Sequence, residues 1–188
     1  MLEDITEVWR SPWQPLGRQA VIAWLIAYAL FLLYAARSAS QYLFIDNANL
    51  VVHEAGHLLV GWTGNQTLTI WGGSLLQWAV PLLLAAWFFG QRQIAGYALC
   101  LFLFFENLLY SATYMADARA MVLPLVTVGD ADNAGHDWNY IFSTLGLLDY
   151  DSRIAAFVRL VGWAGMIAVM LWLALRLRPE SAAQPTSP

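Results

Sequence analysis

One five-residue motif carries the strongest chemical signal in this sequence. It places two histidines and a glutamate, His53, Glu54 and His57, as HEAGH within an apolar segment. Residues four positions apart lie on the same face of an α-helix, so the two imidazoles can bind one metal ion. Glu54 lies beside them and can take a proton from a water molecule on that metal. The motif therefore predicts a zinc site with Glu54 as the catalytic base.

Two residues far along the chain are candidates for a further ligand, because catalytic zinc usually has three protein ligands. His136 is the only remaining histidine, and its neighbour Asp137 could support a ligating imidazole. Asp117 ends a stripe of polar residues that begins at Asn107 and recurs at helical spacing. We favour His136 as the third ligand and Asp117 as a fourth ligand or an orienting group. The alternatives are a surface histidine at 136 and an ion pair between Asp117 and Arg119.

Other polar residues fall close to the motif or within an apolar span. Asn49 and Asp46 lie four and seven residues before His53, on the same helical face, where they could orient the ligands or line an entrance. Glu106 borders the polar stripe and needs a partner such as Arg119 or a bound proton. If no metal binds, these groups form a hydrogen-bonded polar cluster that holds the helices together.

Composition predicts an integral membrane protein. The 188 residues are 60% hydrophobic and only 12% charged, with a mean hydropathy of +0.54, whereas soluble domains carry about 25% charged residues. Membrane lipids are therefore expected partners. All nine cationic residues are arginines, and they form no basic patch of the kind that a nucleic-acid partner requires.

The apolar segments predict an all-α membrane protein with about five transmembrane helices. The expected spans are residues 19–36, 47–62, 74–90, 94–115 and 154–175, of which the second is short and holds the motif. Residues 64–73, rich in Thr and Ile between glycines, predict a short β-hairpin, and residues 117–150 predict a re-entrant or interfacial segment. We expect residues 1–178 to form one membrane domain and residues 179–188 to be a disordered tail.

The chain resembles the site-2 protease family of intramembrane zinc metalloproteases at the HEAGH motif. The resemblance extends to a glycine-rich element at residues 72–74 and to a following span that contains Gln77 and Pro81. In that family two histidines and a distant aspartate bind zinc, and the glutamate activates water. The resemblance implies that the two motif histidines are ligands and that Glu54 is the base. The family's Asn-Pro-Asp-Gly or Leu-Asp-Gly sequence does not occur in this chain.

The later part of the chain, with YMADAR at 114–119 and GHDW at 135–138, looks like small bacterial membrane proteins of unassigned function. That likeness implies a location in the bacterial inner membrane.

Three functional hypotheses follow from the motif. The leading one is an intramembrane metalloprotease, in which a transmembrane substrate peptide adds as a strand to residues 67–71. The second is a metal-dependent hydrolase of lipids or other amphiphiles, which needs no strand edge. The third is a non-enzymatic metal-binding membrane subunit of a larger complex. The variant Glu54→Gln separates enzyme from binding protein, because only an enzyme needs a general base.

Overall fold

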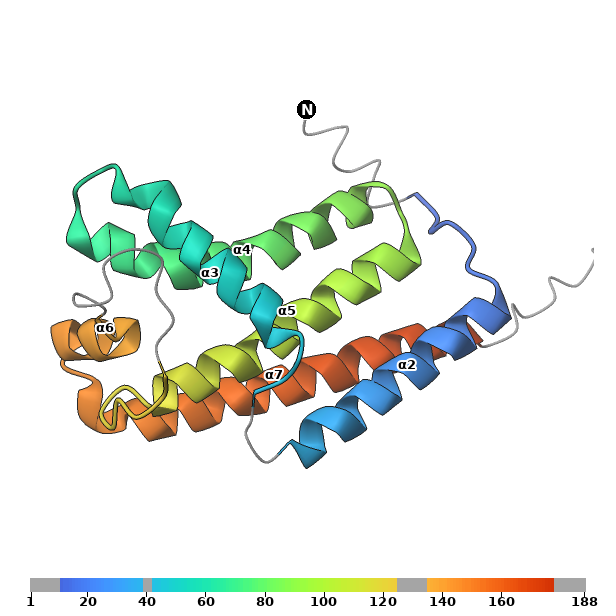
Figure 1. Cartoon of the computed structure of the whole chain (residues 1–188). Coiled ribbons are helices and arrows are strands. Elements are labelled where there is room, and N and C mark those ends of the chain that lie inside the picture. The colour runs from blue at the N-terminus through green and yellow to red at the C-terminus, as the bar shows by residue number, and fades with distance from the viewer. Residues whose placement is uncertain (1–10, 39–41, 125–134, 178–188) are drawn as a thin grey trace, which may run out of the picture.

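The computed structural model describes residues 11–38, 42–124 and 135–177 (Figure 1). Helices and loops make up this described part, without a β-strand, so the all-α prediction is confirmed. The α-helices are α2 (Arg18–Arg37), α3 (Asp46–Gly61), α4 (Gln66–Gly90), α5 (Ile94–Ala116), α6 (Asp137–Leu145) and α7 (Asp151–Ala174). Two short 3-10 helices, η2 (Leu148–Tyr150) and η3 (Leu175–Leu177), flank α7. The expected tail at 179–188 lies outside the described residues.

Four helices are long and apolar enough to cross a membrane, which indicates an integral membrane protein. They are α2, α4, α5, and α7 together with its flanking turns. The motif helix α3 has only 16 residues, and at 1.5 Å per residue it is about 24 Å long, shorter than a hydrocarbon core of about 30 Å. The expected number of about five spans is therefore corrected to four in the described part of the chain.

The expected β-hairpin at residues 64–73 is wrong, because this stretch lies almost entirely within the first two turns of α4. Asn65 caps the helix, and its side-chain oxygen accepts a hydrogen bond from the backbone N–H of Leu68 at 3.1 Å. A helix satisfies its backbone groups internally, which an apolar environment demands. That requirement outweighs the strand preference of the Thr and Ile residues.

Helix α5 forms the centre of the bundle, between α4 on one side and α7 on the other (Figure 1). Helix α7 approaches it closely through two glycines. A β-carbon at Gly162 would lie 2.8 Å from the carbonyl oxygen of Phe105, and one at Gly165 would lie 2.1 Å from the Phe105 ring. Small residues of this kind let membrane helices pack backbone to side chain. Helix α4 packs on α5 and helix α2 packs on α7, so both contact this tight pair.

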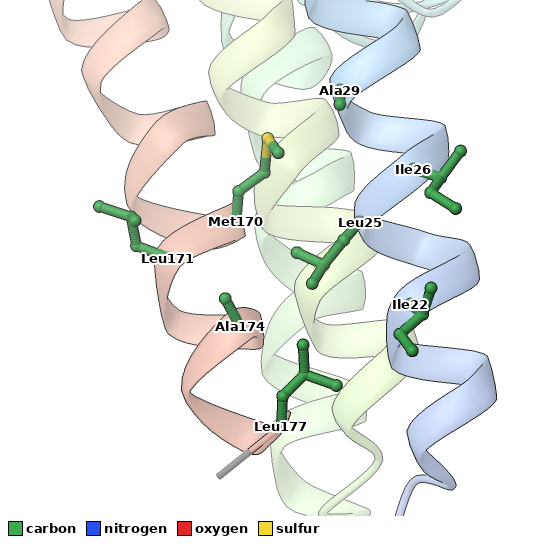
Figure 2. Close-up of a pocket in the computed structure, with 8 residues that line it drawn as sticks. All are labelled: Ile22, Leu25, Ile26, Ala29, Met170, Leu171, Ala174 and Leu177. Atoms are coloured by element: carbon green, nitrogen blue, oxygen red, sulfur yellow. The ribbon is translucent and has the colours of Figure 1, made fainter.

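Helix α2 packs more loosely on α7 and leaves an apolar groove between them (Figure 2). The groove is lined by Ile22, Leu25, Ile26, Ala29, Met170, Leu171, Ala174 and Leu177. None of these side chains is polar or charged, so the groove suits contact with lipid acyl chains.

Part of the segment expected to be re-entrant or interfacial forms the short helix α6. Its apolar face is buried through Trp138, Ile141 and Phe142, which pack with Met115 at the end of α5 and Ala155 at the start of α7. This packing fixes the start of α6 next to the motif helix. Residues 125–134 of the same segment lie outside the described residues.

Candidate metal site

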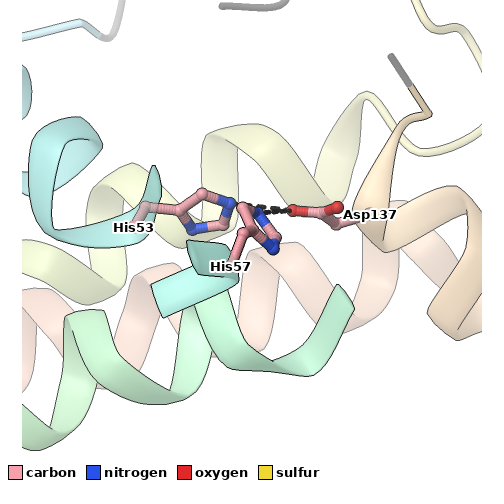
Figure 3. Close-up of side chains that lie close together, drawn as sticks. All are labelled: His53, His57 and Asp137. Atoms are coloured by element: carbon pink, nitrogen blue, oxygen red, sulfur yellow. Dashed lines mark hydrogen bonds and ion pairs between the residues drawn. The ribbon is translucent and has the colours of Figure 1, made fainter. Parts of the chain in front are cut away.

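Two histidines and one aspartate from distant parts of the chain point at one another (Figure 3). His53 and His57 come from α3, and Asp137 is the first residue of α6. The Nε2 atoms of His53 and His57 lie 2.8 and 3.2 Å from the same Oδ2 atom of Asp137. One ligand atom from each of the three residues lies within 4.8 Å of the other two. His53 and Asp137 are buried and His57 is half-buried, so protein covers most of the group.

Close contact between α3 and α4 brings the motif to this position. A β-carbon on Gly56 would lie 2.2 Å from the carbonyl oxygen of Gly72, so the two backbones touch where these glycines meet. Gly73 follows on α4, and a β-carbon there would lie 2.7 Å from Nε2 of both His53 and His57. The glycines of α4 thus allow the helices to approach and leave space beside the two ligand nitrogens.

Hydrogen-bond acceptors on α4 set the tautomers of both histidines. Nδ1 of His57 lies 2.8 Å from the backbone carbonyl oxygen of Thr69, which can only accept, so Nδ1 carries the proton. Nδ1 of His53 lies 2.9 Å from the side-chain oxygen of Gln77 and donates to it in the same way. Nδ1 of each ring is thereby occupied, and Nε2, which faces Asp137, is the nitrogen left for a metal ion. The motif alone does not reveal Thr69 or Gln77 as the two orienting residues.

A hydrogen bond from its backbone N–H holds Asp137 in place. Its N–H donates to the hydroxyl oxygen of Tyr114 on α5 at 3.1 Å. Burial raises the pKa of the Asp137 carboxyl, but the hydrogen bonds and charges of His53 and His57 outweigh burial and lower it overall. Burial likewise lowers the pKa of His57, and Asp137 outweighs that effect and raises it to about 8, with smaller contributions from Thr69 and Glu54.

The donor set and the space around it fit zinc. Two imidazoles and one carboxylate are a ligand set of catalytic zinc sites. Tetrahedral zinc with bonds of about 2.0–2.2 Å holds its ligand atoms roughly 3.3–3.6 Å apart, and the Asp137 oxygen lies 2.8 and 3.2 Å from the two nitrogens. Outward shifts of a few tenths of an ångström would therefore accommodate the ion. Gly73 contributes no side chain to the space beside the nitrogens.

Glu54, the expected base, is half-buried on the same turn of α3 as His53. It is not one of the three clustered donors. Its negative charge contributes to the raised pKa of His57, so the carboxylate acts on the site electrostatically. Glu54 therefore lies beside the three donors without being one of them.

His136 and Asp117, the other expected ligands, lie together outside the three-donor group. His136 caps α6, and its Nδ1 accepts a hydrogen bond from the backbone N–H of Asn139 at 3.2 Å. Its Nε2 faces Oδ2 of Asp117 at 3.3 Å. Burial lowers the pKa of the His136 imidazole, although Asp117 opposes that effect. In the described structure, Asp137 joins the motif histidines where the sequence suggested its neighbour.

The expected partners of Arg119 also differ from those in the structure. Its guanidinium pairs with Asp151 at the start of α7, with nitrogen–oxygen distances of 2.8 Å. The carboxylate of Asp117 instead accepts the backbone N–H groups of Val122 and Leu123, each at 3.0 Å. Arg119 therefore ties α7 to the end of α5 and is not the partner of Glu106.

Comparison with known proteins gives no match to a family model, a curated protein or a solved structure.

Proposed function

We propose that this chain is a membrane-embedded zinc-dependent hydrolase, and that its leading reaction is hydrolysis of a peptide bond within or beside the membrane. The observation that carries the proposal is the meeting of His53, His57 and Asp137 at one point. Three protein ligands leave one position for water or substrate, whereas structural zinc sites usually have four. Glu54 adds a carboxylate that the ligand set does not use.

The proposed roles follow from the positions of the side chains. Zinc, when bound, would supply Lewis acidity, which activates water and polarises a carbonyl group. Glu54 would accept a proton from the attacking water and deliver it to the leaving group. The α4 acceptors Thr69 and Gln77 hold the two imidazoles in the ligating tautomer. Asp137 would complete the ligand set and neutralise part of the charge of the ion.

A second candidate, hydrolysis of a lipid or another amphiphile, is favoured by one observation. Residues 67–71, which were expected to offer a strand edge to a peptide, lie within helix α4. The described residues therefore provide no edge for strand addition. An ester or amide of an amphiphile needs no such pairing, and the same zinc and base chemistry would serve it.

Metal content and the Glu54→Gln variant test the proposal together. After purification in detergent and exchange into metal-free buffer, elemental mass spectrometry should find about one zinc per chain in the wild type and in the variant. Fluorogenic transmembrane peptides and phospholipids, each presented in nanodiscs, distinguish the two substrate classes. The variant should keep its zinc and lose hydrolysis. A wild type without bound zinc would overturn the metal site, and a fully active variant would overturn the role of Glu54.

A further inference from the structure

A chain of side-chain amides leads away from His53 into the protein interior. Gln77 accepts the proton of His53 Nδ1 through its side-chain oxygen at 2.9 Å. Its amide nitrogen donates to the side-chain oxygen of Asn107 on α5 and, at 3.3 Å, to the hydroxyl of Ser111. The amide nitrogen of Asn107 then donates to the side-chain oxygen of Asn49 on α3 at 3.0 Å. Three helices thus contribute to one hydrogen-bonded chain that ends on a candidate metal ligand.

Two buried acids close the far end of this chain. The amide nitrogen of Asn49 donates to Asp46 Oδ1 and to Glu106 Oε2, both at 3.1 Å. Asp46 and Glu106 are 1% and 0% exposed, so water does not compete for Asn49. Every amide in the chain therefore donates in the direction of the acids and accepts from the direction of His53.

The direction of the hydrogen-bonded amide chain determines which ring nitrogen of His53 carries the proton. An amide group that turned around would exchange its oxygen and nitrogen, and Gln77 would then donate to Nδ1 of His53. The proton of that imidazole would move to Nε2, which could no longer bind a metal ion. Gln77 and Asn107 are 2% and 3% exposed, so the surrounding protein must set their orientation.

A proline in α4 fixes the orientation of these two amides. In an α-helix the carbonyl of Gln77 accepts the N–H of residue 81, but Pro81 has no N–H. The freed carbonyl oxygen accepts the amide nitrogen of Asn107 at 3.2 Å instead. A backbone carbonyl can only accept, so the nitrogen of Asn107 must face it and the oxygen of Asn107 must face Gln77. The missing N–H at Pro81 therefore orients both amides.

We propose that Pro81, Asn107 and Gln77 form a positioning device that holds His53 in the tautomer whose Nε2 is free to bind metal. The proposal rests on the zinc site of the proposed function. In this arrangement a backbone carbonyl of α4 orients each of the two histidines. The carbonyl of Thr69 acts directly on His57, and that of Gln77 acts on His53 through two amides.

Leucine variants of the device provide the test, with the ring nitrogens of His53 as the readout. The tautomer is read in metal-free protein labelled with 15N-histidine, in which NMR shifts distinguish the Nδ1–H from the Nε2–H form. Every NMR sample also carries Asp137→Ala, because the Asp137 carboxylate lies 2.8 Å from Nε2 of His53 and would otherwise compete for the proton; zinc affinity is measured with Asp137 in place. Wild type and Gln77→Glu should show the Nδ1–H form, because a carboxylate can also accept that proton. Gln77→Leu and Asn107→Leu should show a mixture of both forms. Their zinc dissociation constants, measured by chelator competition, should rise by about 10- to 100-fold, as for other partners of metal-bound histidines.

Thr113→Val is the matched control on α5. Thr113 bonds the carbonyl of Leu109 and the guanidinium of Arg159, away from the amide chain. Its loss should change neither the tautomer nor the zinc affinity. A control with the same mixture of tautomers as the leucine variants would overturn the proposal.

Pro81→Ala covers the case in which the leucine variants do not fold. It keeps every side chain of the device, adds an N–H that competes for the Gln77 carbonyl, and replaces a proline inside a helix with a better helix former. We expect a detectable Nε2–H form of His53 and several-fold weaker zinc binding without a fall in the thermal unfolding midpoint. A single Nδ1–H form in all folded device variants, or zinc affinity equal to wild type, would overturn the proposal. Failure of wild type to bind zinc would count against the proposed function instead, because the tautomer test needs no metal.

Discussion

The backbone of Gly73 lies directly against the imidazole of His53. A β-carbon at residue 73 would lie 2.7 Å from Nε2 of His53, and it would lie equally close to Nε2 of His57. Non-bonded carbon and nitrogen atoms do not approach so closely without displacement of one of them. The two nitrogens that would bind a metal therefore border a space that exists only because residue 73 is glycine.

Gly73→Ala should remove the metal site while leaving the fold intact. The added methyl group would fill the space beside both ligand nitrogens, so we expect zinc affinity to fall by about 100-fold or more, in keeping with a lost ligand geometry. The helix itself should tolerate alanine, which has a helix propensity about 1 kcal/mol better than glycine. Zinc stoichiometry and thermal unfolding in detergent measure the two effects. Gly61→Ala is the control, because its β-carbon would meet no atom closer than 4.0 Å; equal zinc binding in both variants would contradict the geometry.

Single alanine variants should identify the ligands as His53, His57 and Asp137. Each loss removes one of three donors, and zinc affinity should fall by at least about 100-fold, because two remaining ligands hold zinc poorly. His136→Ala is the matched control, since it removes a buried histidine next to Asp137 that caps α6 and faces Asp117 but is not one of the three donors. It should keep its zinc and lose about 1 kcal/mol of stability. The reverse result, with zinc lost in His136→Ala and kept in Asp137→Ala, would restore the ligand set favoured by sequence alone.

The choice between His136 and Asp137 as the third ligand could not be made from the sequence alone. The HEAGH spacing is local, so the shared face of His53 and His57 could be predicted from helix geometry alone. The third donor comes from 80 residues further on, and the side chain that reaches the site depends on where α6 begins. His136 has an extended backbone and caps the helix, so Asp137 becomes its first residue. A histidine followed by an aspartate before an amphipathic helix is the one local signal for this arrangement.

The number of spans illustrates a second limit. Hydropathy and length correctly predicted the helices that became α2, α4, α5 and α7. Hydropathy also predicts a span at the motif segment, although α3 has only 16 residues and is too short to cross. The Thr and Ile content of residues 64–73 predicts a short hairpin, whereas the Asn65 cap and the apolar surroundings favour a helix. Nothing in the sequence pairs Gln77 with Asn107, although Pro81 four residues later marks the Gln77 carbonyl as free.

Gly56→Ala should destabilise the protein more than alanine at a helical glycine that has open space around it. Its β-carbon would lie 2.2 Å from the carbonyl oxygen of Gly72, and a backbone atom cannot turn away as a flexible side chain can. The helices α3 and α4 would have to separate, at a cost of about 1–3 kcal/mol for overpacking. Thermal unfolding in detergent measures this, with Gly90→Ala as control, because a β-carbon there meets nothing within 4 Å. Equal unfolding midpoints would show that the α3–α4 contact yields more easily than the geometry indicates.

Glu106→Gln should leave stability nearly unchanged, although Glu106 is fully buried in a span. Asn49 donates to Glu106 and to Asp46 from one amide nitrogen, so the two carboxyl groups lie close together. Neither pairs with a cationic side chain among the described residues, and two bare carboxylates at such a place would repel each other strongly. Asp46 accepts the backbone N–H of Leu43 at 2.6 Å as well, which favours Asp46 as the anion and Glu106 as the protonated acid.

A glutamine resembles a protonated glutamic acid in shape and hydrogen bonding, which is why the change at Glu106 should be mild, within about 1 kcal/mol. Asp46→Asn is the informative contrast, because it removes the charged acceptor that Leu43 and Asn49 share, and it should cost about 1–3 kcal/mol. Chemical denaturation in detergent, with both variants measured side by side, gives the two values. If Glu106→Gln proved as costly as Asp46→Asn, the proton would have to be assigned to Asp46 instead, and the negative end of the amide chain would move from α3 to α5.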